Sequence, residues 1–95
     1  MIVGVMTASL HLQGIFSLKE KRSIVKSVIG RLQSRFNASI SEVDHNDSKE
    51  LAVLGISVVG NDTRFVESQL ESVAAFMRRD GRFYLCNVER ETFGV

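Results

Sequence analysis

The spacing of the apolar side chains changes twice along this chain from the two-residue period of a strand to the 3.6-residue period of a helix and back. Alternating or continuously apolar runs predict strands over residues 1–12, 37–45, 51–60 and 82–93. Helical spacing predicts one helix over residues 18–36 and a second, capped by Asn61-Asp62-Thr63 and ended by Gly81. The chain therefore consists of two halves, each with the order strand, helix, strand.

The predicted strands differ in how they use their two faces. On the first strand one face carries Ile2, Gly4, Met6, Ala8, Leu10 and Leu12, and the other carries Val3, Val5, Thr7, Ser9 and His11. The strand over residues 51–60 is apolar on both faces, which indicates a central position. Near Ser41-Glu42 the period of the second strand slips, which predicts a bulge in an edge strand. The last strand fits two facings, with either Phe83 and Leu85 or Tyr84, Cys86 and Val88 turned inward.

The start of the first helix combines a cap with clustered cations. Ser17 and Glu20 have the spacing of a capping box, and Lys19, Lys21 and Arg22 follow in the first turns, where the helix dipole disfavours positive charge. The apolar stripe of this helix is Leu18, Val25, Ile29, Leu32 and Phe36, with Val28 on its flank. Because Lys21 and Arg22 flank the stripe, we expect their charged ends to emerge beside the sheet. There, cations and free backbone N–H groups would suit a phosphate; the alternative is a solvated face with lysine stems covering apolar surface.

The element order βαββαβ predicts a single α+β domain over residues 1–95 with the ferredoxin-like arrangement. Its four-stranded antiparallel sheet has the order 4-1-3-2, and both helices cover one face. The apolar stripe of the second helix is Val66, Leu70, Val73, Ala74 and Met77. This topology is expected to gather charged residues at one end of the molecule: His11, Lys19, Lys21, Arg22, Asp44, His45, Asp47, Arg78, Arg79 and Arg82.

The sheet face without helices is a second candidate surface. It is expected to display Val3, Val5, Val53 and Val59. An uncovered apolar face of this kind typically binds a partner, often another copy of the chain, so we expect a homo-oligomer, most simply a dimer. The alternative is scattered exposed valines, which are normal.

Composition limits the partners and the compartment. The net charge is +1 with 24% charged residues, so a charged partner must be recognised by a local patch, and DNA binding is not expected. The single cysteine, Cys86, cannot form an internal disulfide and points to a reducing compartment. No apolar run is long enough to span a membrane and residues 1–12 do not resemble a signal peptide, so we expect a cytoplasmic protein that binds no membrane.

The sequence contains no complete set of catalytic or metal-binding residues. His11, Asp44, His45 and Asp47 are suitable ligand types, but their spacing is not that of a known metal site. No nucleophile is placed beside either histidine. We therefore expect no metal, no cofactor and no enzymatic activity. The central strands also lack the aromatic residues on which sheet-based RNA readers stack bases, so an RNA would be bound by shape or phosphates.

Two resemblances bear on function. Leu12-Gln-Gly-Ile-Phe16 resembles the phosphate loop of acylphosphatases, but Ser17 stands where that family has an arginine, and residues 51–60 lack its asparagine. A second resemblance extends over the whole chain. The opening Met-Ile-Val-Gly-Val, His11-Leu12, Ser17-Leu-Lys-Glu-Lys-Arg22 and Glu42-Val-Asp-His45 together resemble the bacterial YlxP-like family of unknown function.

The second resemblance implies a ferredoxin-like fold, no established activity, self-association, and a link to ribosomes or RNA. The main hypothesis is thus a small binding protein that holds RNA or a ribosomal partner through His11, Lys19, Lys21, Arg22, Asp44 and His45. The alternative is a homo-oligomeric module that binds a small anion or effector at the same end. An acylphosphatase-like hydrolase is a third hypothesis.

Overall fold

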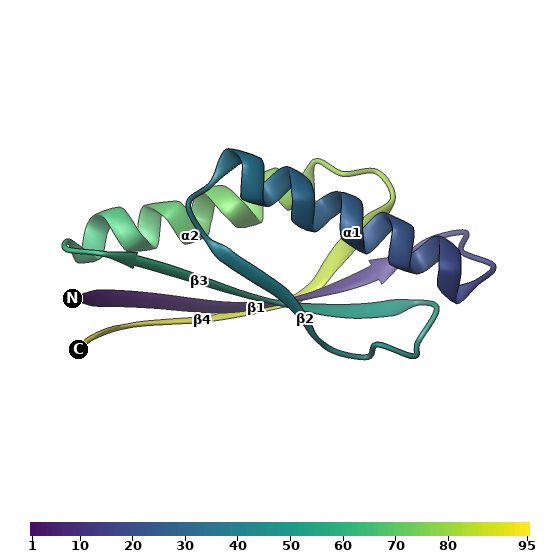
Figure 1. Cartoon of the computed structure of the whole chain (residues 1–95), viewed down its shortest axis with the longest axis horizontal. Coiled ribbons are helices and arrows are strands. Elements are labelled where there is room, and N and C mark those ends of the chain that lie inside the picture. Colours follow the sequence, from purple (N-terminus) through teal and green to yellow (C-terminus); the bar gives the residue numbers. More distant parts are fainter.

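The computed structural model describes residues 1–95, which form one four-stranded sheet and two helices. The elements are β1 (Ile2–Leu12), α1 (Leu18–Arg35), β2 (Ser39–Asp44), β3 (Leu51–Gly60), α2 (Thr63–Arg78) and β4 (Phe83–Gly94). The strand order is β2-β3-β1-β4, every neighbouring pair is antiparallel, and both helices lie on the same side of the sheet (Figure 1). The predicted ferredoxin-like fold and strand order are confirmed.

The core lies between the sheet and the helices, where the inward face of each strand meets the apolar stripe of a helix. All five stripe residues of α2 are buried, as is the predicted inward face of β1 except for Ile2, which is half-buried. On α1 the stripe is rotated from the prediction, because Val28 is fully inside it while Leu18 and Ile29 are only half-buried. This rotation brings Lys21 into the core-facing row.

Both edge strands contain a bulge. In β2 the pairing shifts between Glu42 and Asp44, close to the predicted position. In β4 the pairing with β1 shifts opposite Ser9 and Leu10, which leaves Cys86 as the additional residue. The bulge explains why β4 fits two facings: Phe83 is buried before it and Val88 is half-buried after it, although these residues have opposite parity.

The two helices are staggered along the molecule, which measures 43 × 21 × 18 Å. α1 reaches the end at which β1 finishes, whereas α2 covers the other half of the sheet and ends near the middle (Figure 1). Arg78 and Arg79 therefore do not join the other charged residues, and that part of the prediction is wrong. Arg79 instead shares a hollow with Arg35, at the opposite end of α1 from Lys19.

The first and last residues lie together at the end farthest from the start of α1 (Figure 1). The amino group of Met1 donates a hydrogen bond to the Val95 carbonyl at 3.1 Å, and the Val95 N–H donates one to the Met1 carbonyl at 2.8 Å. Neither helix is long and apolar enough to cross a lipid bilayer.

Candidate functional site

The start of α1 is built by the predicted cap. Ser17 has extended backbone angles, and its hydroxyl oxygen accepts a hydrogen bond from the Glu20 N–H at 3.1 Å. Glu20 in turn accepts a hydrogen bond from the Phe16 N–H at 3.4 Å. The first contact satisfies a free donor of the first turn, and the second holds the preceding loop against the helix.

Lys21 is the one buried charged residue of the structure, and the prediction that its ammonium group emerges for phosphate binding is wrong. Its side chain is 0% exposed, and Nζ lies 2.8 Å from a carboxylate oxygen of Glu42 on β2. The same ammonium donates hydrogen bonds to the carbonyls of His45, at 2.7 Å, and Asn46, at 3.4 Å. Lys21 therefore fastens α1 to β2 and to the turn that follows it.

The two predicted histidines take different places. His45 lies in the β2–β3 turn with a left-handed backbone (φ 59°), and its N–H bonds to the Asp44 carboxylate at 2.8 Å. His11 lies on the open face of β1, where its ring stacks on Tyr84 with centroids 4.9 Å apart and its Nε2 is 4.0 Å from a Glu50 carboxylate oxygen. The structure joins Asp44 and His45 to Lys21 through the turn, while His11 contacts a different strand.

The free cations of α1 lie on its outer surface. Lys19, Arg22 and Lys26 are exposed, and none of them forms an ion pair. Their spacing of three and four residues places them in one row. In all, α1 carries six of the twelve lysines and arginines and a single acid, Glu20. Lys26 was not among the predicted site residues, although its helical spacing from Lys19 and Arg22 could have identified it.

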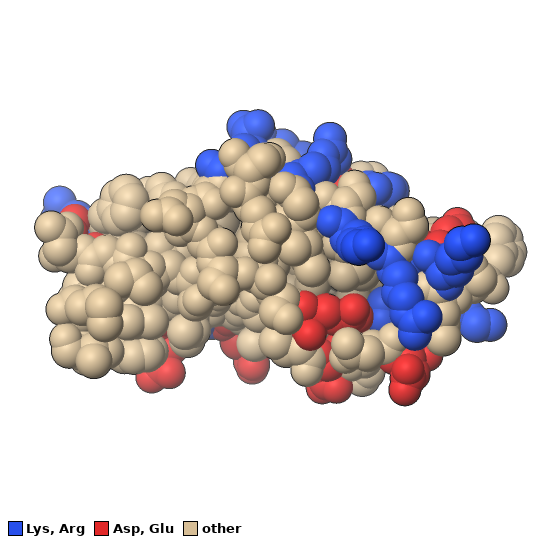
Figure 2. All heavy atoms as spheres, in the orientation of Figure 1, with Lys and Arg blue, Asp and Glu red and all other residues tan.

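The end of the molecule at the β2–β3 turn is not uniformly basic. Asp44, Asp47 and Glu50 accompany the turn and are exposed. Figure 2 shows that the charges are separated: lysines and arginines (blue) lie over the helix layer, and aspartates and glutamates (red) lie along the sheet edge below. The basic surface therefore follows α1 along its length instead of concentrating at the predicted end.

A second group of arginines, which sequence analysis did not assign to a site, lines two adjoining hollows between the C-terminal halves of α1 and α2. The hollows have volumes of about 460 and 140 Å³ and share Phe76 and Arg79. Arg35 lines the larger one and lies over the Phe76 ring, 4.8 Å from its centroid. Arg31 lines the smaller one. These residues come together only because the helices are staggered, so no sequence spacing reveals them.

Asp80 is the one acid at these hollows, and Arg82 neutralises it. Two guanidinium nitrogens of Arg82 lie 2.6 and 2.9 Å from its two carboxylate oxygens. These hydrogen bonds are the main reason that the pKa of Asp80 lies below its ordinary value, and the pKa of Arg82 is raised in return.

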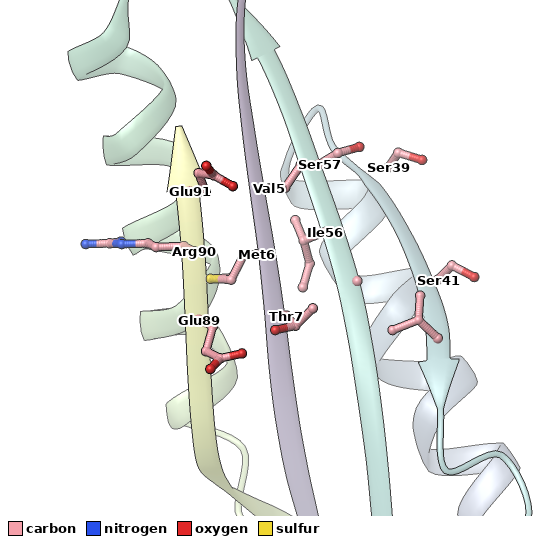
Figure 3. Close-up of a pocket in the computed structure, with 12 residues that line it drawn as sticks. Val5, Met6, Thr7, Ser39, Ser41, Ile56, Ser57, Glu89, Arg90 and Glu91 are labelled. Carbon is pink, nitrogen blue, oxygen red and sulfur yellow. The ribbon is translucent and has the colours of Figure 1, made fainter. Parts of the chain in front are cut away.

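The open face of the sheet contains a hollow of about 720 Å³ that crosses all four strands. Its floor includes Val5 and Gly55, and at Gly55 an added Cβ would lie 2.9 Å from Val43, which leans across from β2. Glu89 and Glu91 point into the hollow from β4, whereas Arg90 between them points away (Figure 3). Of the predicted interface residues, Val59 is 56% exposed and Val3, Val5 and Val53 are half-buried.

Residues 3–90 match the protein family described as "Protein of unknown function (DUF503)". The chain belongs to this family. It is also similar to the uncharacterized protein YlxP of Bacillus subtilis (strain 168), with 39% identity over 61 residues. That match spans 64% of this chain and 66% of the relative. The predicted relation to the YlxP-like proteins is confirmed.

For this member of the DUF503 family, the matched residues include every element from β1 to most of β4. Both the basic row on α1 and the arginines between the helices lie within that range. Neither the family description nor the relative's name states an activity. The function must therefore be argued from the geometry of these surfaces.

Proposed function

We propose that this protein is a non-enzymatic binding module that docks phosphate-rich RNA, free or within the ribosome, along the outer surface of α1. The observation that carries the proposal is the row of unpaired cations Lys19, Arg22 and Lys26 on a helix with a single acid. Neutralising RNA phosphates releases condensed counterions, which is the dominant source of affinity for such surfaces. The acidic sheet edge faces away from this layer and would help to orient the RNA.

An exposed aromatic residue adjoins this row and supports RNA as the ligand. Phe16 is 85% exposed immediately before the cap of α1. An apolar residue at this position ordinarily packs on the fourth residue of the helix, but here that residue is Lys21, which is buried in its ion pair with Glu42. Phe16 is therefore free to stack on an unpaired base, a contact worth about 1–3 kcal/mol in other proteins.

Binding of single-stranded RNA at several salt concentrations tests the phosphate contacts. Reversing Lys19, Arg22 and Lys26 to glutamate should abolish binding, and single reversals should each weaken it. In a variant with neutral residues at positions 19, 22 and 26, the slope of log K against log salt should become less steep by about 2. Each phosphate contact to a single strand contributes about 0.7 to the steepness. Arg64→Glu, an exposed cation in the first turn of α2, is the matched control. RNA binding that is indifferent to salt and to the triple reversal would overturn the proposal.

A tryptophan at position 16 reports directly on base stacking, because the chain contains no natural tryptophan. RNA should quench the emission of Phe16→Trp strongly. The control is Phe65→Trp, at a 51% exposed phenylalanine near the start of α2, whose emission should hardly change. Equal responses at both positions, or none at position 16 while RNA is bound, would rule out stacking by Phe16.

The two other hypotheses from the sequence have less support. A small anion held at the start of α1 would lack Lys21, whose ammonium group is already fully engaged. A thermal-shift comparison decides between this anion and RNA. Stabilisation by a small phosphate compound that is lost on reversing Lys19, Arg22 and Lys26, together with no stabilisation by RNA, would favour the anion. For the hydrolase, Ser17 caps α1 instead of presenting a guanidinium group. We expect no hydrolysis of an acyl phosphate above background.

We further propose that the open sheet face joins two copies of the chain. Its hollow has carboxylates at the β4 edge, from Glu89 and Glu91, and hydroxyls at the β2 edge, from Ser39 and Ser41 (Figure 3). A twofold axis parallel to the strands would place the carboxylates of one copy over the hydroxyls of the other. The only cation at this hollow, Arg90, turns away and pairs with Glu71 at 2.8 Å. A second copy fits this face better than an RNA, and both α1 helices would stay accessible.

A further inference from the structure

The hollows between α1 and α2 have the build of a small-ligand site. The larger one, about 460 Å³, is lined by Arg35, Phe36, Ser72, Ala75, Phe76 and Arg79. Its volume lies within the range of about 300–1,000 Å³ that small-molecule pockets occupy. Its lining combines three apolar residues with two exposed arginines and one hydroxyl, so it is more polar than most small-molecule pockets and suits a charged ligand.

The charge of the hollows is unbalanced. Arg31, Arg35 and Arg79 form no ion pair, and Asp80 is already held by Arg82. Cations are favourable at the C-terminal end of a helix, which accounts for Arg35 on α1 and for Arg78 and Arg79 at the end of α2. It does not account for Arg31, which lies a full turn before Arg35 and lines the adjoining hollow, where its charge helps to lower the pKa of Asp80 without forming an ion pair with it.

One of these arginines, Arg35, is also held in place before any ligand binds. Arg35 rests on the face of Phe76, and Phe36 meets the same ring edge-on with centroids 6.1 Å apart. A guanidinium group fixed on an aromatic ring keeps its planar set of donors available for a multiply charged oxyanion. Because the side chain is already ordered, less conformational entropy is lost on binding.

We propose that these hollows bind a terminal phosphate, a phosphomonoester, with Arg35 and Arg79 contacting its oxygens and Arg31 adding charge from the adjoining hollow. The Ser72 hydroxyl can donate a further hydrogen bond, and Phe36, Ala75 and Phe76 offer apolar surface to the organic group. The phosphomonoester could belong to a small metabolite or to the 5′ end of an RNA. This site uses none of the residues of the RNA surface on α1 and does not depend on it.

Calorimetric titration with adenosine 5′-monophosphate and with adenosine tests the site. The monophosphate should bind and adenosine should not. Arg35→Gln and Arg79→Gln should each lower the affinity at least tenfold, and Arg35→Lys should restore only part of it, because an ammonium group lacks the planar donor set. Arg64→Gln is the control, and urea unfolding of each variant shows that the fold is kept. Equal binding of adenosine and its monophosphate, or binding that survives both glutamine variants, would overturn the proposal. So would the absence of binding by both the monophosphate and a 5′-phosphorylated RNA.

Two RNAs of one sequence, with a 5′-phosphate or a 5′-hydroxyl, distinguish the sources. A preference for the phosphorylated RNA that disappears in Arg79→Gln assigns the site to an RNA end, whereas equal RNA affinities with tight monophosphate binding assign it to a metabolite. The triple reversal of Lys19, Arg22 and Lys26 should leave monophosphate binding unchanged. Failure of this site can thus be told apart from failure of the RNA surface.

Discussion

At the scale of single residues, Lys21 shows how a charged side chain can belong to a core. Residues 21, 25, 28 and 32 follow the helical spacing of one face, so Lys21 continues the row of Val25, Val28 and Leu32. A pattern that counts only apolar residues omits it. Its partner Glu42 lies on another strand, and no local signal predicts their contact. The cap formed by Ser17 and Glu20 could be predicted because both residues belong to one turn.

Replacing Lys21 with methionine should destabilise the protein by about 3 kcal/mol, because Glu42 would lose its partner in a largely buried site. The Glu42 side chain keeps 16% exposure, which places the expected loss at the lower end of the range for buried pairs. Urea unfolding measures the change. Glu42→Gln in the same chain should recover part of it, and the exposed control Lys19→Met should change stability by no more than about 0.5 kcal/mol.

Lys21 is expected to contribute to stability and not to RNA binding, whereas its neighbour Arg22 is expected to contact RNA. Under conditions where both variants are folded, Lys21→Met should bind RNA as the natural chain does, whereas Arg22→Met should bind more weakly. Equal losses of RNA affinity in the two variants would show that Lys21 leaves its ion pair to contact the ligand.

The pair of Asp80 and Arg82 should make stability depend on pH. Folding lowers the pKa of Asp80 from its ordinary value of 3.8, so the unfolded chain binds more protons in this range and the free energy of unfolding rises with pH. The stabilisation is fully present above the unfolded value and is lost as the pH falls through the lower pKa of the folded state. Urea unfolding between pH 2 and 6 measures the free energy of unfolding of the natural chain and of Asp80→Asn. The natural chain should be the more stable at pH 6, and this difference should shrink as the pH falls. A constant difference would contradict this role.

At the scale of elements, periodicity predicted all six helices and strands, because each one has a face turned to the core. Two features could not be found in this way. The bulge at Cys86 depends on the pairing of β4 with β1, and the stagger of the helices depends on how each packs on the sheet. The position of Arg79 beside Arg35 follows from that stagger, which is why the arginine-lined hollows were missed.

The packing of α2 on β1 is close enough to require glycine at position 4. A Cβ added there would lie 2.5 Å from a Val66 methyl carbon and 2.9 Å from one of Leu70. Gly4→Ala should therefore destabilise the protein by about 1–3 kcal/mol through overpacking. Thermal or urea unfolding measures the loss. Val66→Ala should cost less in the Gly4→Ala background than in the natural chain, and purely additive losses would contradict this packing.

At the scale of the whole molecule, lysines and arginines gather over the helix layer (Figure 2), whereas the hollow of the open sheet face combines apolar residues with Glu89 and Glu91. If two copies meet through that face, Val59→Asp should shift the protein toward monomer without affecting its fold, because this side chain is 56% exposed. Light scattering at high micromolar concentration measures the change, with Phe65→Asp on the helix side as control. A natural chain that is monomeric at that concentration would remove the proposed dimer.

Because residues 1 and 95 lie side by side, the molecule can be attached through its termini to a surface or to another protein from one end only. Because Met1 and Val95 are hydrogen-bonded to each other at one end of an axis 43 Å long, a linker fused to either residue leaves from the same point. A protein immobilised there would present Phe16 and the start of α1 outward, at the far end (Figure 1). A short peptide joining residue 95 to residue 1 would close the backbone into a ring with both proposed RNA contacts unobstructed, and it would stabilise the fold by restricting the unfolded chain.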